Sequence, residues 1–124
     1  LNPAAARLKD GRAMVYGTMG GDGQPQTQAA VFSRYAVFGQ PLQQAVTAPR
    51  WLLGRTWGDT SDTLKLESRF PAPVVDELKR RGHEVDLLAA FTETMGHAGA
   101  AVRQVNGSFE GAFDPRGNGA AAGY

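Results

Sequence analysis

A glycine-rich stretch near the start of the chain constrains its fold more than any other segment. Four of the seven residues from 17 to 23 are glycine. The apolar run before this stretch predicts a strand over 13–16 that ends at Gly17, and the long apolar segment after it predicts a helix from Gln24 to Phe38. A strand, a tight turn and a helix N-terminus in this order present free backbone amides, which can bind a negatively charged oxygen.

The amides of this turn fit an oxyanion hole better than a phosphate-binding loop or a dinucleotide-binding site. The segment lacks the Gly-Lys-Ser/Thr sequence of a phosphate-binding loop, and Gly21-Asp22-Gly23 lacks the third glycine of a dinucleotide fingerprint. The Gly20-Gly21 pair can instead form an oxyanion hole, in which each preorganised N–H lowers a reaction barrier by about 3 to 4 kcal/mol. The simpler alternative, which the residues alone favour, is a tight turn whose glycines only supply positive φ.

The rest of the chain predicts a mixture of helices and strands. Gly39 ends the first helix, Pro41 begins a second one, and Pro49 limits its length. The next element is a half-buried strand over 63–67, with Lys65 and Glu67 on its outer side or at its end. A surface helix follows over 73–81, with the pairs Asp76–Arg80 and Glu77–Arg81. The last elements are a strand over 84–88 and a hairpin of 102–105 and 108–112 around a type I′ turn at Asn106-Gly107. Because helices and strands do not alternate strictly, we expect an α+β fold with at least one antiparallel sheet, in a single unit over residues 1–124.

The composition argues against several kinds of site. Thirteen basic and twelve acidic residues nearly cancel, so we expect no nucleic-acid partner. The chain has no cysteine and only two histidines. We interpret His83 as a helix C-terminal cap or a solvent-exposed residue, and we favour a packing or turn role for His97, with a position at a site as the alternative; we therefore expect no metal and no cofactor. Trp51 and Trp57 are interpreted as packing residues, and Arg80-Arg81 as the solvated end of a helix.

The last residues of the chain form a polar, glycine-rich segment that ends on an aromatic side chain. It begins with Asp114-Pro115-Arg116 and ends with Gly123-Tyr124. The simplest interpretation is a tail that Tyr124 docks onto the fold, with a contact between Asp114 and Arg116.

Four short blocks, spread over the whole chain, follow one known pattern. Leu1-Asn2-Pro3 resembles the end of a Ser-Ser-Met-Ser-Pro segment, and residues 17–21 resemble Gly-(Ser/Thr)-Pro-Gly-Gly. Ala45–Arg50 resembles a turn that ends in Ala-Pro-Arg, and the segment from Asp114 to Tyr124 resembles Asp-Pro-Arg…Ala-Gly-Tyr. In this order, the blocks resemble the C-terminal part of the small subunit of the gamma-glutamyltranspeptidase (gamma-glutamyltransferase) family.

The resemblance implies a fold and a mechanism. Its members are N-terminal-nucleophile hydrolases, so the chain is expected to be part of an αββα sandwich, with a mixed or antiparallel sheet and flanking helices. By the same resemblance, the precursor cleaves itself into two subunits, and the new N-terminal Thr attacks a γ-glutamyl amide to form an acyl-enzyme, which water or an acceptor amine resolves. The resemblance makes Gly20 and Gly21 the oxyanion-hole pair, and it places Asn2 at a Ser position next to the residues that bind the substrate.

The resemblance also implies that the chain needs partners. The nucleophilic Thr is not in this chain, and the two serines associated with the substrate's α-carboxylate would precede Leu1. We therefore expect a fragment that is inactive alone and that works with the large subunit and the N-terminal part of the small subunit. Exposed strand edges could also make it dimerise. The family resemblance is compatible with a periplasmic or extracellular protein and leaves a cytoplasmic one open.

Three departures from the family pattern leave the substrate open. Met19 stands in place of Pro, Asp22 follows the glycine pair where a small or basic residue is common, and Asn2 stands in place of Ser. The first alternative is therefore a related acylase that acts on another acidic acyl amide, such as a glutaryl or oxamate-type substrate. The second is a structural or interaction fragment that has the same fold and no catalytic role.

Overall fold

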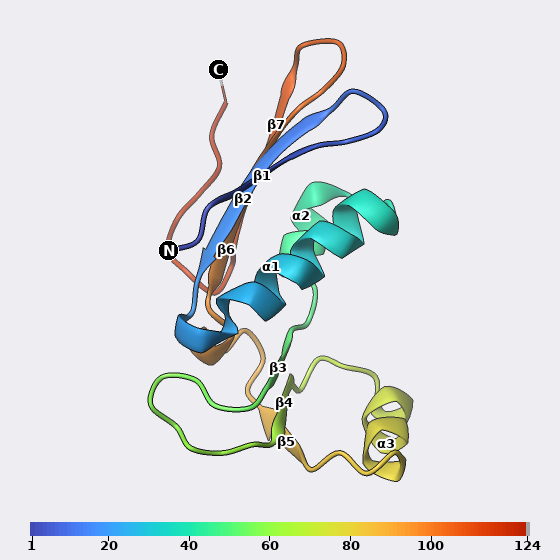
Figure 1. Cartoon of the computed structure of the whole chain (residues 1–124), viewed down its shortest axis with the longest axis vertical. Coiled ribbons are helices and arrows are strands. Elements are labelled where there is room, and N and C mark those ends of the chain that lie inside the picture. Colours follow the sequence, from blue (N-terminus) through green and yellow to red (C-terminus); the bar gives the residue numbers. More distant parts are fainter. Residues whose placement is uncertain (124) are drawn as a thin grey trace.

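The computed structural model describes residues 1–123 as two sheets with helices on one side (Figure 1). The larger sheet has the strand order β1-β2-β6-β7, and every neighbouring pair is antiparallel. Its strands are β1 (Ala4–Arg7), β2 (Ala13–Met19), β6 (His97–Arg103) and β7 (Phe109–Phe113). Tyr124, which was predicted to dock the tail, lies outside the described residues.

Helical segments cover one face of the larger sheet (Figure 1). They are the short 3₁₀ turn η1 (Gly21–Gly23), α1 (Gln24–Phe32), the π-helical turn η2 (Ser33–Val37) and α2 (Leu42–Thr47). Along each strand, side chains alternate between the face toward the helices and the opposite face. The core between the sheet and these helices is apolar. Its buried residues are Met14, Val31, Tyr35, Leu42, Ala45, Val46, Ala98, Val102 and Ala112.

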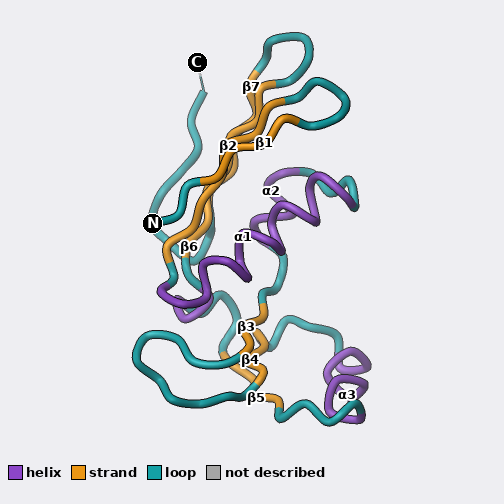
Figure 2. Tube along the Cα trace, viewed as in Figure 1, coloured by secondary structure: helices purple, strands orange, loops and turns teal. Residues whose placement is uncertain are grey.

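The smaller sheet lies beyond the N-terminal end of α1 (Figure 2). It contains β3 (Trp51–Leu53), β4 (Leu64–Glu67) and β5 (Val85–Leu88), with β4 antiparallel to β3 and parallel to β5. The helix α3 (Ala72–Arg80) packs Val75 against Leu64 and Leu66 of β4. The mixture of antiparallel and parallel strands with flanking helices confirms the α+β class.

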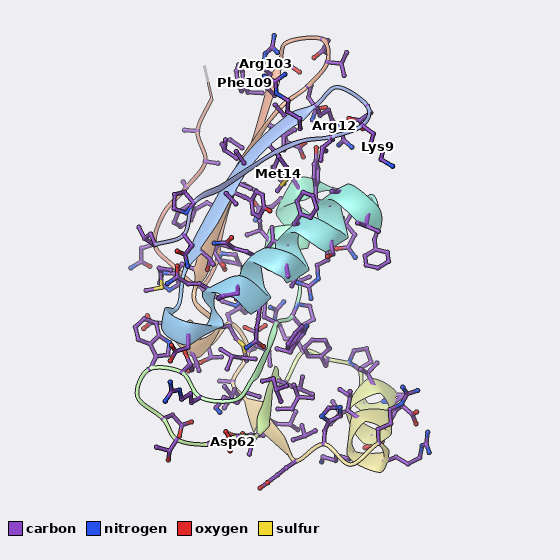
Figure 3. The ribbon with its side chains drawn as sticks, in the orientation of Figure 1. Lys9, Arg12, Met14, Asp62, Arg103 and Phe109 are labelled. Carbon is purple, nitrogen blue, oxygen red and sulfur yellow. The ribbon has the colours of Figure 1, made fainter. Side chains whose placement is uncertain are left out.

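Labelled side chains mark the two ends of the molecule (Figure 3). The turn between β1 and β2, with Lys9 and Arg12, lies at the same end as the β6–β7 hairpin, with Arg103 and Phe109. Asp62 lies near the opposite end, in the long loop between β3 and β4. Beyond β7 the chain returns along this strand, where Ala121 approaches Gly111 and Gly119 lies against the ring of Phe113.

Several predicted elements are confirmed with different limits. The strand expected to end at Gly17 continues to Met19, because β6 pairs with it along its whole length. The strand β1 and the first half of β6 were not predicted, since their alanine- and glycine-rich sequences have neither β-branched residues nor alternation. The helix predicted over 24–38 forms as α1 followed by the π-helical turn η2, and Phe38 at its end is 73% exposed.

The predicted hairpin around Asn106-Gly107 forms with another turn. Only Gly107 has a positive φ, of 89°, and its amide donates to Gln104 O at 2.9 Å. Gln104 N donates to Ser108 O, so a three-residue loop with a glycine bulge replaces the expected type I′ turn. In α3, both Arg80 and Arg81 pair with Glu77, whereas Asp76 was expected to pair with Arg80.

The strand predicted over 63–67 is confirmed as β4, but the prediction that it is half-buried is wrong. All four residues of β4 are buried, including Lys65 and Glu67. Trp57 was interpreted as a packing residue, yet it is 57% exposed. Among the described helices, none is long and apolar enough to cross a membrane.

Candidate functional site

The glycine pair lies where β2 ends and the helical layer begins. Gly20 has φ 152° and ψ 29° and precedes η1, and Gly21 has φ 55°. L side chains rarely adopt either conformation, so both positions require glycine for backbone reasons. Within residues 1–123, neither the Gly20 amide nor the Gly21 amide donates a hydrogen bond to a protein acceptor.

Two neighbouring segments hold the glycine pair from behind. The Gly20 carbonyl accepts a bond from Gly23 N at 3.1 Å and another from Thr56 Oγ1 at 3.3 Å. Gly96 has φ 69° and packs against the backbone of Met19 and Gly20 so closely that a Cβ at this position would lie 2.0 Å from Met19 O. The turn is therefore fixed through its carbonyls and its buried side, while the amides of the pair remain available.

A hollow of about 470 Å³ lies beside Gly21. A Cβ on Gly21 would come within 3.4 Å of Thr56 Oγ1 and 3.7 Å of Trp57 N, and both residues line the hollow. The lining also includes apolar Met19 and Leu88, three acidic side chains and one lysine; the charged residues are Asp59, Asp86, Glu93 and Lys65. Residues next to the glycine pair in sequence or in space, Met19, Thr56 and Trp57, therefore line a space large enough for a small molecule.

Asn2 lies at a second hollow, of about 510 Å³, on the side of the large sheet away from the helices. The backbone N–H of Asn2 donates to Gln24 Oε1 at 3.1 Å, and the backbone carbonyl of Asn2 accepts a bond from the side chain of Gln28. These bonds attach the start of the chain to α1. His97 lines the same hollow with its Nε2 buried and without a hydrogen-bond partner among the described residues. Met19 lines both hollows.

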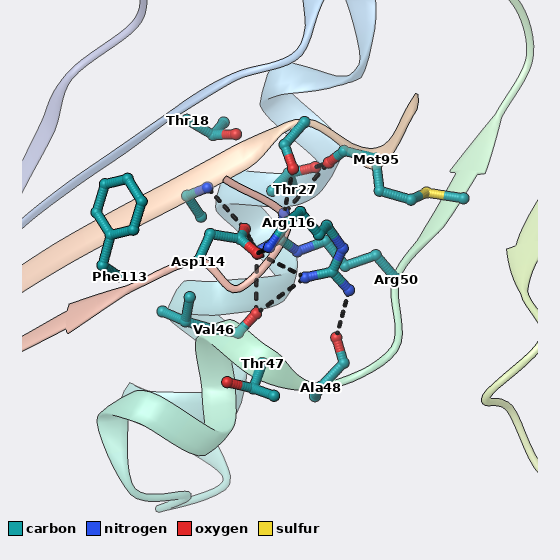
Figure 4. Close-up of polar contacts among 12 residues, drawn as sticks. Thr18, Thr27, Val46, Thr47, Ala48, Arg50, Met95, Phe113, Asp114 and Arg116 are labelled. Atoms are coloured by element: carbon teal, nitrogen blue, oxygen red, sulfur yellow. Dashed lines mark hydrogen bonds and ion pairs between the residues drawn. The ribbon is translucent and has the colours of Figure 1, made fainter. Parts of the chain in front are cut away.

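A buried network of charged side chains joins the two sheets, and Figure 4 shows its part around Arg50, Asp114 and Arg116. Asp114 accepts bonds from the guanidinium groups of Arg50 and Arg116, as well as from Ala98 N at 2.8 Å. Arg116 reaches Glu67 through two bonds of 2.6 Å. Arg50 also donates to Gly96 O at 3.0 Å, so the network contacts the segment that packs against Gly20. The expected contact between Asp114 and Arg116 is confirmed, at 2.9 Å.

The two buried carboxyl groups are held in their charged form. Burial alone would raise the pKa of Asp114, but the charge of Arg50, the amides of Arg116 and Ala98, and the charge of Arg116 outweigh it, and the pKa is lowered. Burial likewise raises the pKa of Glu67, and the opposing bonds from Arg116, Arg50 N and Arg69 lower it below the ordinary value. Burial lowers the pKa of Arg50 to about 10, which leaves it protonated at neutral pH.

Some residues of this region could be found from the sequence and others could not. The Ala-Pro-Arg and Asp-Pro-Arg blocks contain Arg50, Asp114 and Arg116, but the pattern alone did not indicate that they meet. Thr56 and Gly96 carried no signal, because each contacts Gly20 across a long stretch of sequence. Among residues 1–123, no group of three His, Asp or Glu side chains is arranged to hold a metal ion.

Comparisons with known proteins agree with the resemblance seen in the sequence. The family model described as gamma-glutamyltranspeptidase matches residues 1–124. The chain is 67% identical over 124 residues to the oxamate amidohydrolase proenzyme of Klebsiella pneumoniae, and it covers 24% of that protein. It is 44% identical over 110 residues to the glutathione hydrolase-like YwrD proenzyme of Bacillus subtilis, of which it covers 21%. The chain thus spans less than a quarter of the length of these curated relatives.

A solved structure supports the fold. The gamma-glutamyltranspeptidase from Pseudomonas nitroreducens, complexed with L-DON, matches 99% of the chain with a TM-score of 0.78 and 26% sequence identity. The match covers 61% of that protein's chain. The arrangement of sheet and helices is therefore that of N-terminal-nucleophile hydrolases of this kind, as expected.

Proposed function

The chain belongs to the gamma-glutamyltranspeptidase family, and from this premise we propose that the whole protein cleaves an acidic acyl amide through an acyl-enzyme. The observation that supports this most directly is the pair of amides at Gly20 and Gly21, which donate to no acceptor among residues 1–123 and whose neighbours Met19, Thr56 and Trp57 line a hollow. The nucleophile of this proposal is an N-terminal Thr outside residues 1–124. The relatives' greater length leaves room for it, since the chain covers only 24% and 21% of them.

The proposed reaction uses the glycine pair while charge develops on the substrate. The Thr hydroxyl attacks the amide carbon as the α-amine of the same residue takes its proton. The carbonyl oxygen becomes an oxyanion, which accepts hydrogen bonds from the Gly20 and Gly21 amides. The tetrahedral intermediate expels the amine with a proton, and water or an acceptor amine then attacks the ester and restores the Thr. The described residues would supply the oxyanion donors and Asn2 near the acyl group.

Two substrate classes compete, and the sequence comparison favours one of them. The relative with 67% identity is called an oxamate amidohydrolase, whereas the one with 44% identity is called glutathione hydrolase-like. Met19, Asp22 and Asn2 also depart from the pattern of γ-glutamyl enzymes. We therefore propose an oxamate-type amide, whose carboxylate is next to the scissile amide, as the leading substrate, and a γ-glutamyl amide as the second.

The two substrates can be separated with the purified whole protein. Ammonia release from oxamate and aniline release from a γ-glutamyl anilide are measured side by side, and we expect the higher kcat/KM for oxamate. Faster turnover of the anilide would reverse the order of the two substrates. Residues 1–124 expressed alone should turn over neither compound, and activity of that chain would contradict an external nucleophile.

A substitution tests the role of the glycine pair. Gly21→Val should lower kcat by about 100-fold or more, because a distorted turn misplaces an oxyanion donor. Gly82→Val is the matched control, since Gly82 also has a positive φ, of 93°, but has open space around its Cβ position and lies just after α3, outside the loop that carries Thr56. Equal kcat values in the two variants would remove the oxyanion role.

A protein that matures without self-cleavage at a Thr would favour the structural alternative.

A further inference from the structure

We propose that Thr56 is a positioning residue that orients the Gly20–Gly21 peptide for catalysis. This inference rests on the proposed function, because it concerns the direction of the Gly21 amide. Thr56 lies 36 residues from Gly20 in the sequence, in the long loop between β3 and β4, and its hydroxyl donates to Gly20 O at 3.3 Å. Nothing in the sequence pattern marks it.

The planarity of the peptide bond links this contact to the Gly21 amide. In a trans peptide, the carbonyl of one residue and the N–H of the next lie in one plane and point in opposite directions. All peptide bonds described in the chain are trans. The two donors on Gly20 O, Thr56 Oγ1 and Gly23 N, therefore fix the direction of the Gly21 N–H, which points away from them.

Thr56 is built into the fold in a way that suits this role. Its side chain is only 1% exposed, although it lies in a loop whose neighbours on both sides are exposed. Its hydroxyl also lies 3.4 Å from the position that a Cβ on Gly21 would take. The same side chain therefore contacts the Gly20 carbonyl and limits the space behind Gly21.

The loop that carries Thr56 is itself anchored. Lys65 Nζ donates to Gly54 O at 2.9 Å and to Ser61 O at 3.4 Å, and it pairs with Asp59 at 3.3 Å. These contacts tie down the loop on both sides of Thr56. Trp57, the next residue, has φ 54°, which is a strained conformation for a bulky side chain and is typical of functional segments.

The test compares variants of Thr56 in the whole protein with the amide substrate that the protein turns over. Thr56→Val removes the hydroxyl and keeps the shape, and it should lower kcat by about 10- to 100-fold with KM changed less than about twofold, since the bond acts on the transition state. Thr56→Ser keeps the hydroxyl and should retain most of the activity. Thr56→Ala replaces Thr56→Val if the latter does not fold.

A control in the same loop separates positioning from general loosening. Thr63→Val removes hydrogen bonds to Ser61 and Lys65 but none to the glycine pair. An equal loss of kcat in Thr63→Val and Thr56→Val, or an unchanged kcat in Thr56→Val, would overturn the role of Thr56.

A measurement independent of activity keeps this inference distinct from the proposed function. With ¹⁵N-glycine labelling, Thr56→Val should shift the Gly21 amide resonance and leave that of Gly54 in place, whereas Thr63→Val should leave Gly21 unchanged. A shifted Gly21 resonance in a protein that turns over no acyl amide would refute the proposed function and keep the orienting contact. An unshifted Gly21 resonance would refute the contact, whatever the activity.

Discussion

Glu67 and Arg116 form a two-point ion pair between the two sheets, although they are 49 residues apart in the sequence. Arg116 Nε and Nη2 each lie 2.6 Å from an oxygen of Glu67, and both side chains are fully buried. Glu67 is the last residue of β4 in the small sheet, and Arg116 follows β7 of the large sheet. The pair therefore fixes the small sheet, with its long loop, to the sheet that carries the glycine turn.

Removing one partner of this pair should destabilise the protein strongly. Arg116→Met would leave Glu67 buried without two of its bonds and Asp114 without one, which costs about 3 to 5 kcal/mol of unfolding free energy. Urea unfolding measures this loss. Arg80→Met is the matched control, because Arg80 is exposed and its one ion-pair partner among residues 1–123 is Glu77 on its own helix, and it should leave the midpoint unchanged. Similar midpoints for the two variants would contradict the structural role of Arg116.

Acid should weaken the fold through the same carboxyl groups. The pKa values of Glu67 and Asp114 are lower in the folded protein than in the unfolded chain. Their contribution to stability is therefore complete above the ordinary carboxyl pKa of about 4, and it is lost as the pH falls from there through the folded-state values. Urea midpoints measured from pH 7 to pH 2 should fall most steeply below about pH 4. Glu67→Gln should make this dependence shallower, and an unchanged slope would exclude Glu67 as a source.

The buried charges also explain why part of the fold could not be predicted. In the strand around Leu64 and Leu66, alternation with Lys65 and Glu67 indicated one outer polar face. The structure buries both polar side chains, because Arg116, Arg50 and Arg69 reach Glu67 and loop carbonyls reach Lys65. A local pattern cannot contain this information, since the partners are distant in the sequence.

The position of the glycine turn, in contrast, could be predicted from the sequence. Its position between a strand and a helix follows from residues 13–38 alone, because glycine conformations and helix termini are local properties. Its surroundings are not local: Thr56 and Gly96 reach Gly20 through the loop after β3 and the start of β6. The sequence thus predicted where free amides occur and could not predict which residues orient them.

The close approach of Gly96 to the glycine turn gives a sharp packing test. A Cβ at Gly96 would lie 2.0 Å from Met19 O and 2.9 Å from Gly20 Cα, so Gly96→Ala must displace the turn. We expect this variant to lose about 1 to 3 kcal/mol of unfolding free energy beyond the backbone strain that any alanine suffers at such a φ. Gly58→Ala measures that strain by itself, since Gly58 has φ 80° and open space around its Cβ position. Equal thermal midpoints of the two variants would contradict the packing of Gly96 against the turn.

The buried lysine gives a test of how the loop beside the glycine pair is held. Lys65→Met keeps most of the side-chain volume but leaves the carbonyls of Gly54 and Ser61 without their donor, which costs about 1 to 3 kcal/mol for local opening. Hydrogen exchange of the amides from 54 to 63 should therefore become faster by about tenfold or more, while exchange in β2 and β6 stays slow because their ladder is intact. Lys79→Met, on the exposed side of α3, removes the same charge without touching the loop and should leave its exchange unchanged. If both variants give the same exchange rates in the loop, Lys65 does not anchor it, and Thr56 must be held in place by its own contact with Gly20.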